Sequence, residues 1–147
     1  MLPEVTPNDN FYFVTLYVTS KEQNGLEGLI PFELSELKEL QILSLEQGLL
    51  KGTIPSSLGD LKKLKILDLD YNVLSGSIPL EVFNISSLLQ LDLNNNLLTG
   101  IIPDNVGTLE NLVFIQLQNN QLSGSIPTGF GKLDNIRKCG FLHLSEI

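Results

Sequence analysis

Residues 64–79 read LKILDLDYNVLSGSIP, residues 88–103 read LLQLDLNNNLLTGIIP, and residues 112–127 read LVFIQLQNNQLSGSIP. The three stretches begin 24 residues apart and share the pattern L-x-x-L-x-L-x-x-N-x-L-x-G-x-I-P, with Ile115 in place of the second leucine in the last of them. The shorter element L-x-G-x-I-P occurs five times at this spacing, and its prolines are Pro31, Pro55, Pro79, Pro103 and Pro127. A fixed period of this kind is typical of a repeat architecture.

The first half of each unit predicts a β-strand with one buried face, because leucines alternate with other residues, as in Leu67-Asp68-Leu69. The asparagine that follows is expected to lie inside the turn and to satisfy backbone groups that no strand partner reaches. Stacked units would then form an asparagine ladder of Asn72, Asn96 and Asn120. The proline lacks an N–H and fits the start of the return segment. No unit can bury its leucines alone, so the units are predicted to stack.

The units resemble the plant-type leucine-rich repeat of receptor-like kinase ectodomains, receptor-like proteins and polygalacturonase-inhibiting proteins. The resemblance runs from about Val14 to Leu133, and L-x-G-x-I-P is its most distinctive element. It implies an α/β-type repeat solenoid, a right-handed superhelix of about five 24-residue coils plus a degenerate sixth. A parallel sheet would line the concave face, a second short strand would lie near L-x-G, and 3-10 or loop segments would form the returns. The resemblance also implies recognition of proteins, peptides or glycans, and an extracellular or plasma-membrane location for a full-length parent.

Composition excludes several classes of function. The chain has 147 residues, including 31 leucines and no alanine, and its 9 basic and 17 acidic residues give a net charge of −8. The missing alanine, with 12 glycines and 7 prolines, argues against a helical bundle. The acidic balance argues against nucleic acid or an anionic membrane as partner. One cysteine and one histidine argue against a zinc site, so we predict no cofactor and no metal.

The ends of the chain depart from the repeat. We predict an N-terminal extension over residues 1–13, the repeat domain over residues 14–133, and a degenerate partial repeat over residues 134–147, in which Cys139 takes the place of a core leucine. The N-terminus lacks the features of a signal peptide, and no run of about 18 apolar residues predicts a membrane span. The sequence alone therefore does not assign a location.

Two further departures bear on stacking. Gly48 replaces the ladder asparagine of the second unit, which should weaken the ladder there. The paired-cysteine caps usual in the resembling family are absent, and an uncapped coil exposes apolar residues. Either these residues form an improvised cap or they mediate self-association, and they are Leu133, Ile136, Phe141 and Leu142.

Side chains between the buried leucines are predicted to face solvent on the concave sheet. Stacked in register, one column reads Tyr17, Ser44, Asp68, Asp92 and Gln116, and the next reads Thr19, Glu46, Asp70, Asn94 and Gln118. Adjacent strands lie about 5 Å apart, so like charges would face each other and favour a basic or polar peptide partner. The candidate partner-binding residues are Glu46, Asp68, Asp70, Tyr71, Asp92, Asn94, Phe114, Gln116 and Gln118. The alternative is a solvated face without a partner.

The sequence gives less support to catalysis or metal binding. Asp68 and Asp92 have the spacing of a retaining glycosidase, but an open sheet offers no water-excluding pocket, so no catalytic residue is assigned. Clustered carboxylates suit Ca²⁺, yet no D-x-D-x-D-G loop is present. Cys139 and His143 lack a third, orienting group. Asn84 begins the sequon Asn-Ile-Ser on the return side of its coil, where it is either N-glycosylated or unmodified.

Three functional interpretations remain. The first is a non-enzymatic module that recognises a protein or peptide in signalling or defence. The second is a soluble enzyme inhibitor or scaffold. The third is a truncated piece of a receptor-like kinase, although this chain contains no G-x-G-x-x-G or H-R-D kinase motif.

Overall fold

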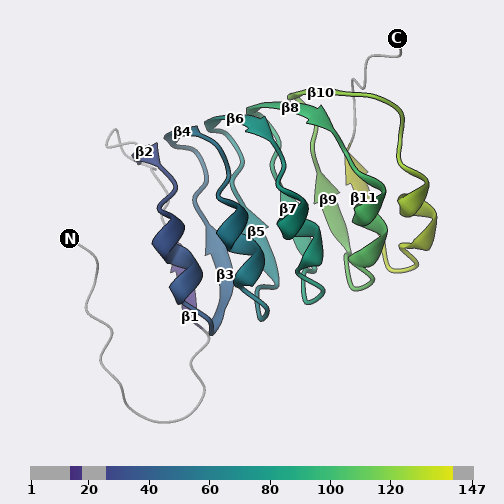
Figure 1. The fold of residues 1–147 in the computed structure, drawn as a ribbon, viewed down its shortest axis with the longest axis horizontal. Helices are drawn as coiled ribbons and strands as arrows, with labels where there is room; N and C mark the ends of the chain where they lie inside the picture. Colours follow the sequence, from purple (N-terminus) through teal and green to yellow (C-terminus); the bar gives the residue numbers. More distant parts are fainter. Residues whose placement is uncertain (1–13, 18–25, 141–147) are drawn as a thin grey trace.

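A proline precedes the return segment of each described repeat. The computed structural model describes residues 14–17 and 26–140. Each repeated proline adopts a φ between −62° and −79° and caps a five-residue 3-10 helix, and these helices are η1 (Phe32–Glu36), η2 (Ser56–Asp60), η3 (Leu80–Asn84), η4 (Asp104–Thr108) and η5 (Thr128–Lys132). The pyrrolidine ring restricts φ to this range, so the position suits proline. Figure 1 shows the returns side by side along the length of the molecule.

The strands form two parallel sheets. The larger sheet has the order β1-β3-β5-β7-β9-β11 and consists of β1 (Val14–Tyr17), β3 (Leu40–Ser44), β5 (Ile66–Asp68), β7 (Gln90–Asp92), β9 (Phe114–Gln116) and β11 (Lys138–Gly140). The second sheet has the order β10-β8-β6-β4-β2 and consists of β2 (Glu27–Leu29), β4 (Leu49–Gly52), β6 (Val73–Ser77), β8 (Leu97–Ile101) and β10 (Gln121–Ser123). In Figure 1 the larger sheet lies behind the returns and the second sheet along the upper edge. The predicted solenoid is confirmed.

The register of the larger sheet confirms the predicted columns. Asp68 pairs with Ser44 on one side and with Asp92 on the other, and Asp92 pairs in turn with Gln116. The pairing continues past the ends of the strands, because Gln47 N donates to Asp70 O at 3.1 Å and the next two coils repeat this bond. Residues 24 apart therefore lie side by side, and Thr19 lies outside the described residues.

Leucines from successive coils form one continuous core. Leu67, Leu91 and Ile115 are fully buried, and the leucines that precede and follow them in the repeat are buried as well. Phe83 is the largest fully buried side chain and occupies the position at which two neighbouring coils have Gly59 and Gly107. Each such side chain contributes about 1.5–3 kcal/mol when its apolar surface is removed from water.

The ladder asparagines join one coil to the next. Asn96 Nδ2 donates to Leu69 O at 2.9 Å in the preceding coil and to Leu93 O at 3.2 Å in its own coil. Its Oδ1 accepts from Leu74 N at 3.0 Å, at the start of the preceding coil's second strand. Asn72 and Asn120 make the same set of bonds. One amide therefore satisfies backbone groups from both sheets.

Two glycines lie where neighbouring coils approach each other closely. Where Gly48 replaces the ladder asparagine, Leu49 N donates directly to Leu26 O at 2.7 Å, and a Cβ at Gly48 would lie 2.9 Å from that oxygen. Gly52 has a φ of +76°, and a Cβ there would lie 2.6 Å from Leu29 Cδ2 of the preceding coil. All five L-x-G glycines have a positive φ, so the left-handed backbone favours glycine at this position.

The last described coil is only partly buried. β11 pairs with β9, so the degenerate sixth unit still supplies a strand. Cys139 pairs with Ile115 and so takes the place of a core leucine as predicted, but the expectation that it is buried is wrong, because it is exposed on the outermost strand of the described sheet. Leu133 is buried and Ile136 packs against the core, whereas Phe141, Leu142 and His143 lie outside the described residues. In the described part of the chain, no helix has the length and apolarity that a membrane crossing requires.

Replacing a ladder asparagine tests its role in stability. We expect Asn96→Ala to lower the free energy of unfolding by about 2–4 kcal/mol, because buried backbone groups would each lose a partner at about 1–3 kcal/mol. The exposed Asn105→Ala on η4 serves as the matched control, with an expected change within about 0.5 kcal/mol. Denaturant unfolding of both variants measures the difference, and equal losses would contradict a specific role for the ladder.

Candidate functional site

Three carboxylates converge where β3 and β5 end. Asp68 is the last residue of β5, Asp70 follows two residues later, and Glu46 holds the place of Asp70 in the preceding coil. One carboxylate oxygen from each residue lies within 4.8 Å of the others, and all three side chains are half-buried. We call Glu46, Asp68 and Asp70 the acidic cluster. The fixed register of the coils produces it, because equivalent positions are stacked.

Burial and the charges of neighbouring carboxylates raise the pKa values of Asp68 and Asp70. Burial, together with the charges of Asp70, Asp92 and Glu46, raises the pKa of Asp68 to about 7, although the bond from Asp70 N to Asp68 Oδ1 opposes the shift. Burial and the charges of Asp92 and Glu46 raise the pKa of Asp70 to about 6, and a contact with the Asn94 amide opposes this shift. The folded structure thus disfavours the full negative charge of the cluster.

Every charge that shifts the pKa of Asp68 or Asp70 comes from another carboxylate. The salt bridges found among the described residues, Lys38–Asp60 and Lys63–Glu39, lie away from the cluster. Asp70 Oδ1 is buried, and it has no hydrogen-bond partner among the residues that the structure describes. The cluster therefore has unused capacity to accept hydrogen bonds and to attract a positive charge.

Asp92 belongs to an internal network. Its side chain is 4% exposed, and both oxygens accept hydrogen bonds from side-chain amides, one from Asn94 and the other from Gln116. The prediction that its column and the next face solvent is wrong for Asp92, for Asn94 and for Ser44, which are all buried. Amide side chains from the same coil and from the next coil cover the carboxylate. Asp92 contributes its charge to the cluster but presents no contact surface.

The remaining predicted residues are spread along the sheet. Gln116 and Gln118 are half-buried on the coil beyond Asp92, and Gln118 Nε2 donates to Gln116 Oε1 at 3.5 Å. Phe114 is 39% exposed on β9, so β7 separates it from β5 and the acidic cluster. Tyr71 directly follows Asp70 and is more exposed. Asn84 is exposed at the end of η3, on the returns, and its glycosylation stays a prediction.

The turn before each ladder position has a left-handed backbone. Gln47, Tyr71, Asn95 and Asn119 have φ values between +49° and +56°. Asparagine tolerates this conformation, whereas a bulky side chain such as Tyr71 is strained in it. The asparagines at positions 95 and 119 were the sequence signal for this turn.

The second sheet carries an exposed apolar row that was not predicted from the sequence. Leu49, Val73 and Leu97 are the first residues of β4, β6 and β8 and occupy one repeat position. They are 57%, 39% and 46% exposed, because strand alternation turns the next leucine of each coil inward. The doublets at residues 49–50 and 97–98 could have revealed this, since only one leucine of each can face the core.

The acidic cluster does not by itself make a metal site. Three carboxylates supply only part of the about six to eight oxygen ligands that Ca²⁺ prefers. We therefore assign no metal and no cofactor to these residues.

Comparison with known proteins supports the repeat assignment. The family model described as Leucine Rich Repeat matches residues 63–85, 87–109 and 111–133. No curated protein sequence gives a significant match.

Three solved plant proteins illustrate the similarity in fold. The plant peptide hormone receptor RGFR1 in complex with RGF2 is 39% identical with a TM-score of 0.77, and the match covers 78% of this chain and 18% of that one. The ectodomain of the receptor kinase SOBIR1 from Arabidopsis thaliana is 34% identical with a TM-score of 0.76, over 81% of this chain and 65% of that one. A plant ice-binding protein is 39% identical with a TM-score of 0.74, and the match covers 79% of this chain and 37% of that one. This chain spans less than two thirds of each of these relatives.

The raised pKa values predict how stability depends on pH. Because the pKa of Asp68 is about 7 in the folded protein and about 3.9 in an unfolded chain, the folded state binds more protons between these values. The free energy of unfolding should therefore fall as the pH rises through this window, and Asp70 adds to the fall up to about pH 6.

We expect Asp68→Asn to flatten this profile, so that the variant gains stability relative to wild type near pH 7.5 but not near pH 4. The exposed Glu110→Gln removes one charge outside the cluster and should keep the wild-type slope. Denaturant unfolding at several pH values checks this, and parallel profiles for wild type and Asp68→Asn would contradict it.

Proposed function

The chain belongs to the plant-type leucine-rich repeat proteins, and we propose that it recognises a polypeptide with a basic segment through the acidic cluster. The observation that carries this proposal is the convergence of Glu46, Asp68 and Asp70 within 4.8 Å. A lysine or arginine side chain placed there would stabilise the ionised carboxylates, which now repel one another. Arginine would add paired hydrogen bonds to a carboxylate of the cluster.

The relatives support a polypeptide as the ligand. RGFR1 is a peptide hormone receptor described in complex with RGF2, and SOBIR1 is a receptor kinase whose ectodomain has this fold. We place this chain accordingly in the extracellular part of a plant receptor or receptor-like protein that acts in signalling or defence. An enzyme inhibitor or scaffold would use the same surface, with a basic protein surface in place of a peptide.

Recognition fits the described residues better than catalysis does. A retaining glycosidase needs two carboxylates that are free to act on a substrate. Both oxygens of Asp92 instead accept hydrogen bonds from Asn94 and Gln116. The carboxylates of the acidic cluster lie on the face of a sheet, where several coils can contact an extended ligand at once.

A displayed library of random linear dodecapeptides tests the proposal. We expect selection on the wild-type protein to enrich arginine and lysine, and the selected peptides to bind more weakly as salt rises. The double variant Asp68→Asn, Asp70→Asn should lose at least about tenfold in affinity, because a charge-assisted hydrogen bond contributes about 1.5–3 kcal/mol. Calorimetric titration of the selected peptides measures the loss.

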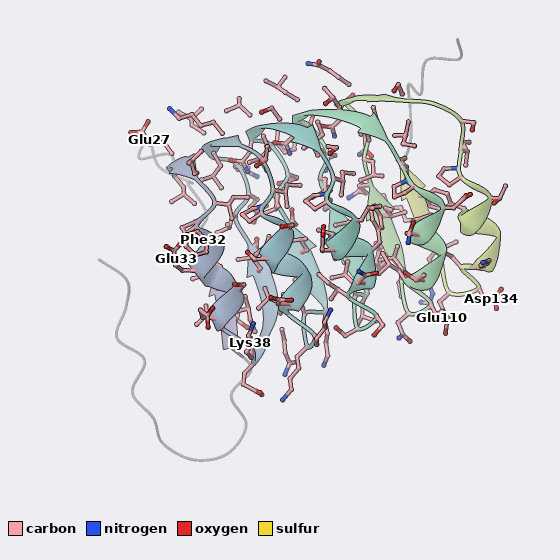
Figure 2. All side chains as sticks on the ribbon, in the orientation of Figure 1. Glu27, Phe32, Glu33, Lys38, Glu110 and Asp134 are labelled. Atoms are coloured by element: carbon pink, nitrogen blue, oxygen red, sulfur yellow. The ribbon has the colours of Figure 1, made fainter. Side chains whose placement is uncertain are left out.

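The matched control is the double variant Glu33→Gln, Glu110→Gln, which removes the same number of charges from exposed positions. Both residues lie at the outer margin of the molecule on the return side (Figure 2). Its affinities should stay within about twofold of wild type, because exposed charges outside the site act weakly. Selection without basic enrichment, or equal losses in both double variants, would refute the proposal.

The similarity to a plant ice-binding protein favours ice as a second candidate ligand. The second sheet carries outward hydroxyl side chains, among which Ser77 pairs in register with Thr99. Strands about 4.8 Å apart present such hydroxyls at regular intervals, and regularly placed hydroxyls can hold ordered water.

This second candidate predicts that the wild-type protein slows the coarsening of ice grains in a frozen sucrose solution. Ser77→Asp combined with Thr99→Asp should abolish the effect by disturbing the hydroxyl array, whereas the Glu33→Gln, Glu110→Gln control should retain it. Cryomicroscopy of grain size over time measures both, and grains as coarse as those with serum albumin would exclude ice binding.

A further inference from the structure

An exposed apolar strip borders the acidic cluster. Asn72 Oδ1 accepts from Leu50 N at 3.0 Å, so the turn that carries Tyr71 lies beside the start of β4 and Leu49. Asn96 makes the equivalent bond to Leu74 N, which places the start of β6 beside the next turn. We call Leu49, Tyr71, Val73 and Leu97 the apolar rim. It runs over three neighbouring coils, and Tyr71 follows Asp70 directly in the chain.

The fold does not require these apolar side chains. Strand alternation points Leu50, Leu74 and Leu98 inward, and all three are buried. The next coil has Gln121 at the rim position and still buries its inward leucine, Leu122. A polar residue is therefore compatible with the same coil geometry, and the three apolar residues gain little from the packing of this chain.

The backbone conformation of Tyr71 is energetically unfavourable, and its side chain is exposed. Its φ is +49°, and the two following coils place Asn95 and Asn119 in this conformation. Its side chain is 55% exposed, so burial does not offset the strain. Strained backbone that persists without a packing reason is concentrated at functional sites. An aromatic ring at this point is suited to contact a ligand, including a cation that lies over the ring face.

We propose that the peptide partner carries an aliphatic or aromatic side chain close to its basic residue, and that this side chain packs on the apolar rim. The inference rests on the proposed function, because the negative charge of the acidic cluster selects the basic residue that sets the position of the peptide. An extended chain rises about 3.3 Å per residue, and the rim begins one residue after Asp70 and reaches Val73 two residues later. The apolar and basic residues of the partner are therefore separated by no more than about three positions.

A defined peptide series tests this. The probes are capped nonapeptides of glycine and serine that contain two adjacent arginines. One peptide has no other substitution, and the others carry one leucine placed two, three or six positions from the nearer arginine. We expect leucine at two or three positions to raise the affinity for the wild-type protein at least about fivefold over the arginine-only peptide, in line with burial of one apolar side chain. Leucine at six positions should add less than about twofold, because it lies beyond the rim.

The variant Leu49→Gln, Val73→Gln copies the glutamine that the chain itself has at residue 121, so it should remain folded. It should bind the arginine-only peptide as the wild type does and lose the gain from leucine. Tyr71→Asn should raise the melting temperature by relieving the left-handed strain, and should also reduce the gain from leucine.

The two proposals fail in different ways. If the arginine-only peptide does not bind, or binds Asp68→Asn, Asp70→Asn equally well, the proposed function fails. If it binds through the acidic cluster but leucine adds nothing, or adds equally in the glutamine variant, only the apolar rim inference fails. A concentration-dependent dimer in light scattering that the glutamine variant abolishes would assign the rim to a second copy of the chain and also overturn the inference.

Discussion

The asparagine after each strand fixes how one coil sits on the next. Its amide binds the backbone of two consecutive coils and of both sheets, as Asn96 does through Leu69 O, Leu93 O and Leu74 N. Because these bonds are the same in three coils, neighbouring coils cannot slip by a residue without losing them. Every other position of the repeat is then stacked on its own equivalent. The acidic cluster follows from this constraint, since Glu46 and Asp70 occupy equivalent positions on adjacent coils.

The period and the strand alternation were sufficient to predict stacked units and their columns, and the resemblance to plant-type leucine-rich repeats supplied the solenoid with its parallel sheet. They predicted that Asp68 lies between Ser44 and Asp92, because a parallel register of identical units leaves no other pairing. They also predicted which asparagines follow the strands. These are backbone properties, and a repeat expresses them many times over.

Burial of individual side chains could not be predicted in the same way. Asp92 is buried because the side-chain amides of Asn94 and Gln116 cover its carboxylate. The periodic pattern of the sequence does not indicate in which direction a side-chain amide points. Cys139 occupies a core position of the repeat, paired with Ile115, but is exposed on the outermost strand of the described sheet. The strain at Tyr71 arises from a turn that the other coils form with asparagine or glutamine. Each of these depends on neighbours rather than on the unit itself.

The side chains at outward positions change from coil to coil, although the backbone geometry of the coils stays the same. The column through Asp70 reads Glu46, Asp70, Asn94 and Gln118, so charge gives way to neutral amides from one end to the other. The rim position changes in the same direction, from Leu49, Val73 and Leu97 to Gln121. Since the ladder holds all four coils in one geometry, stability does not require this gradient. A ligand lying across the sheet would therefore meet charge and apolar surface at one end and amide groups at the other, which orients it along the solenoid.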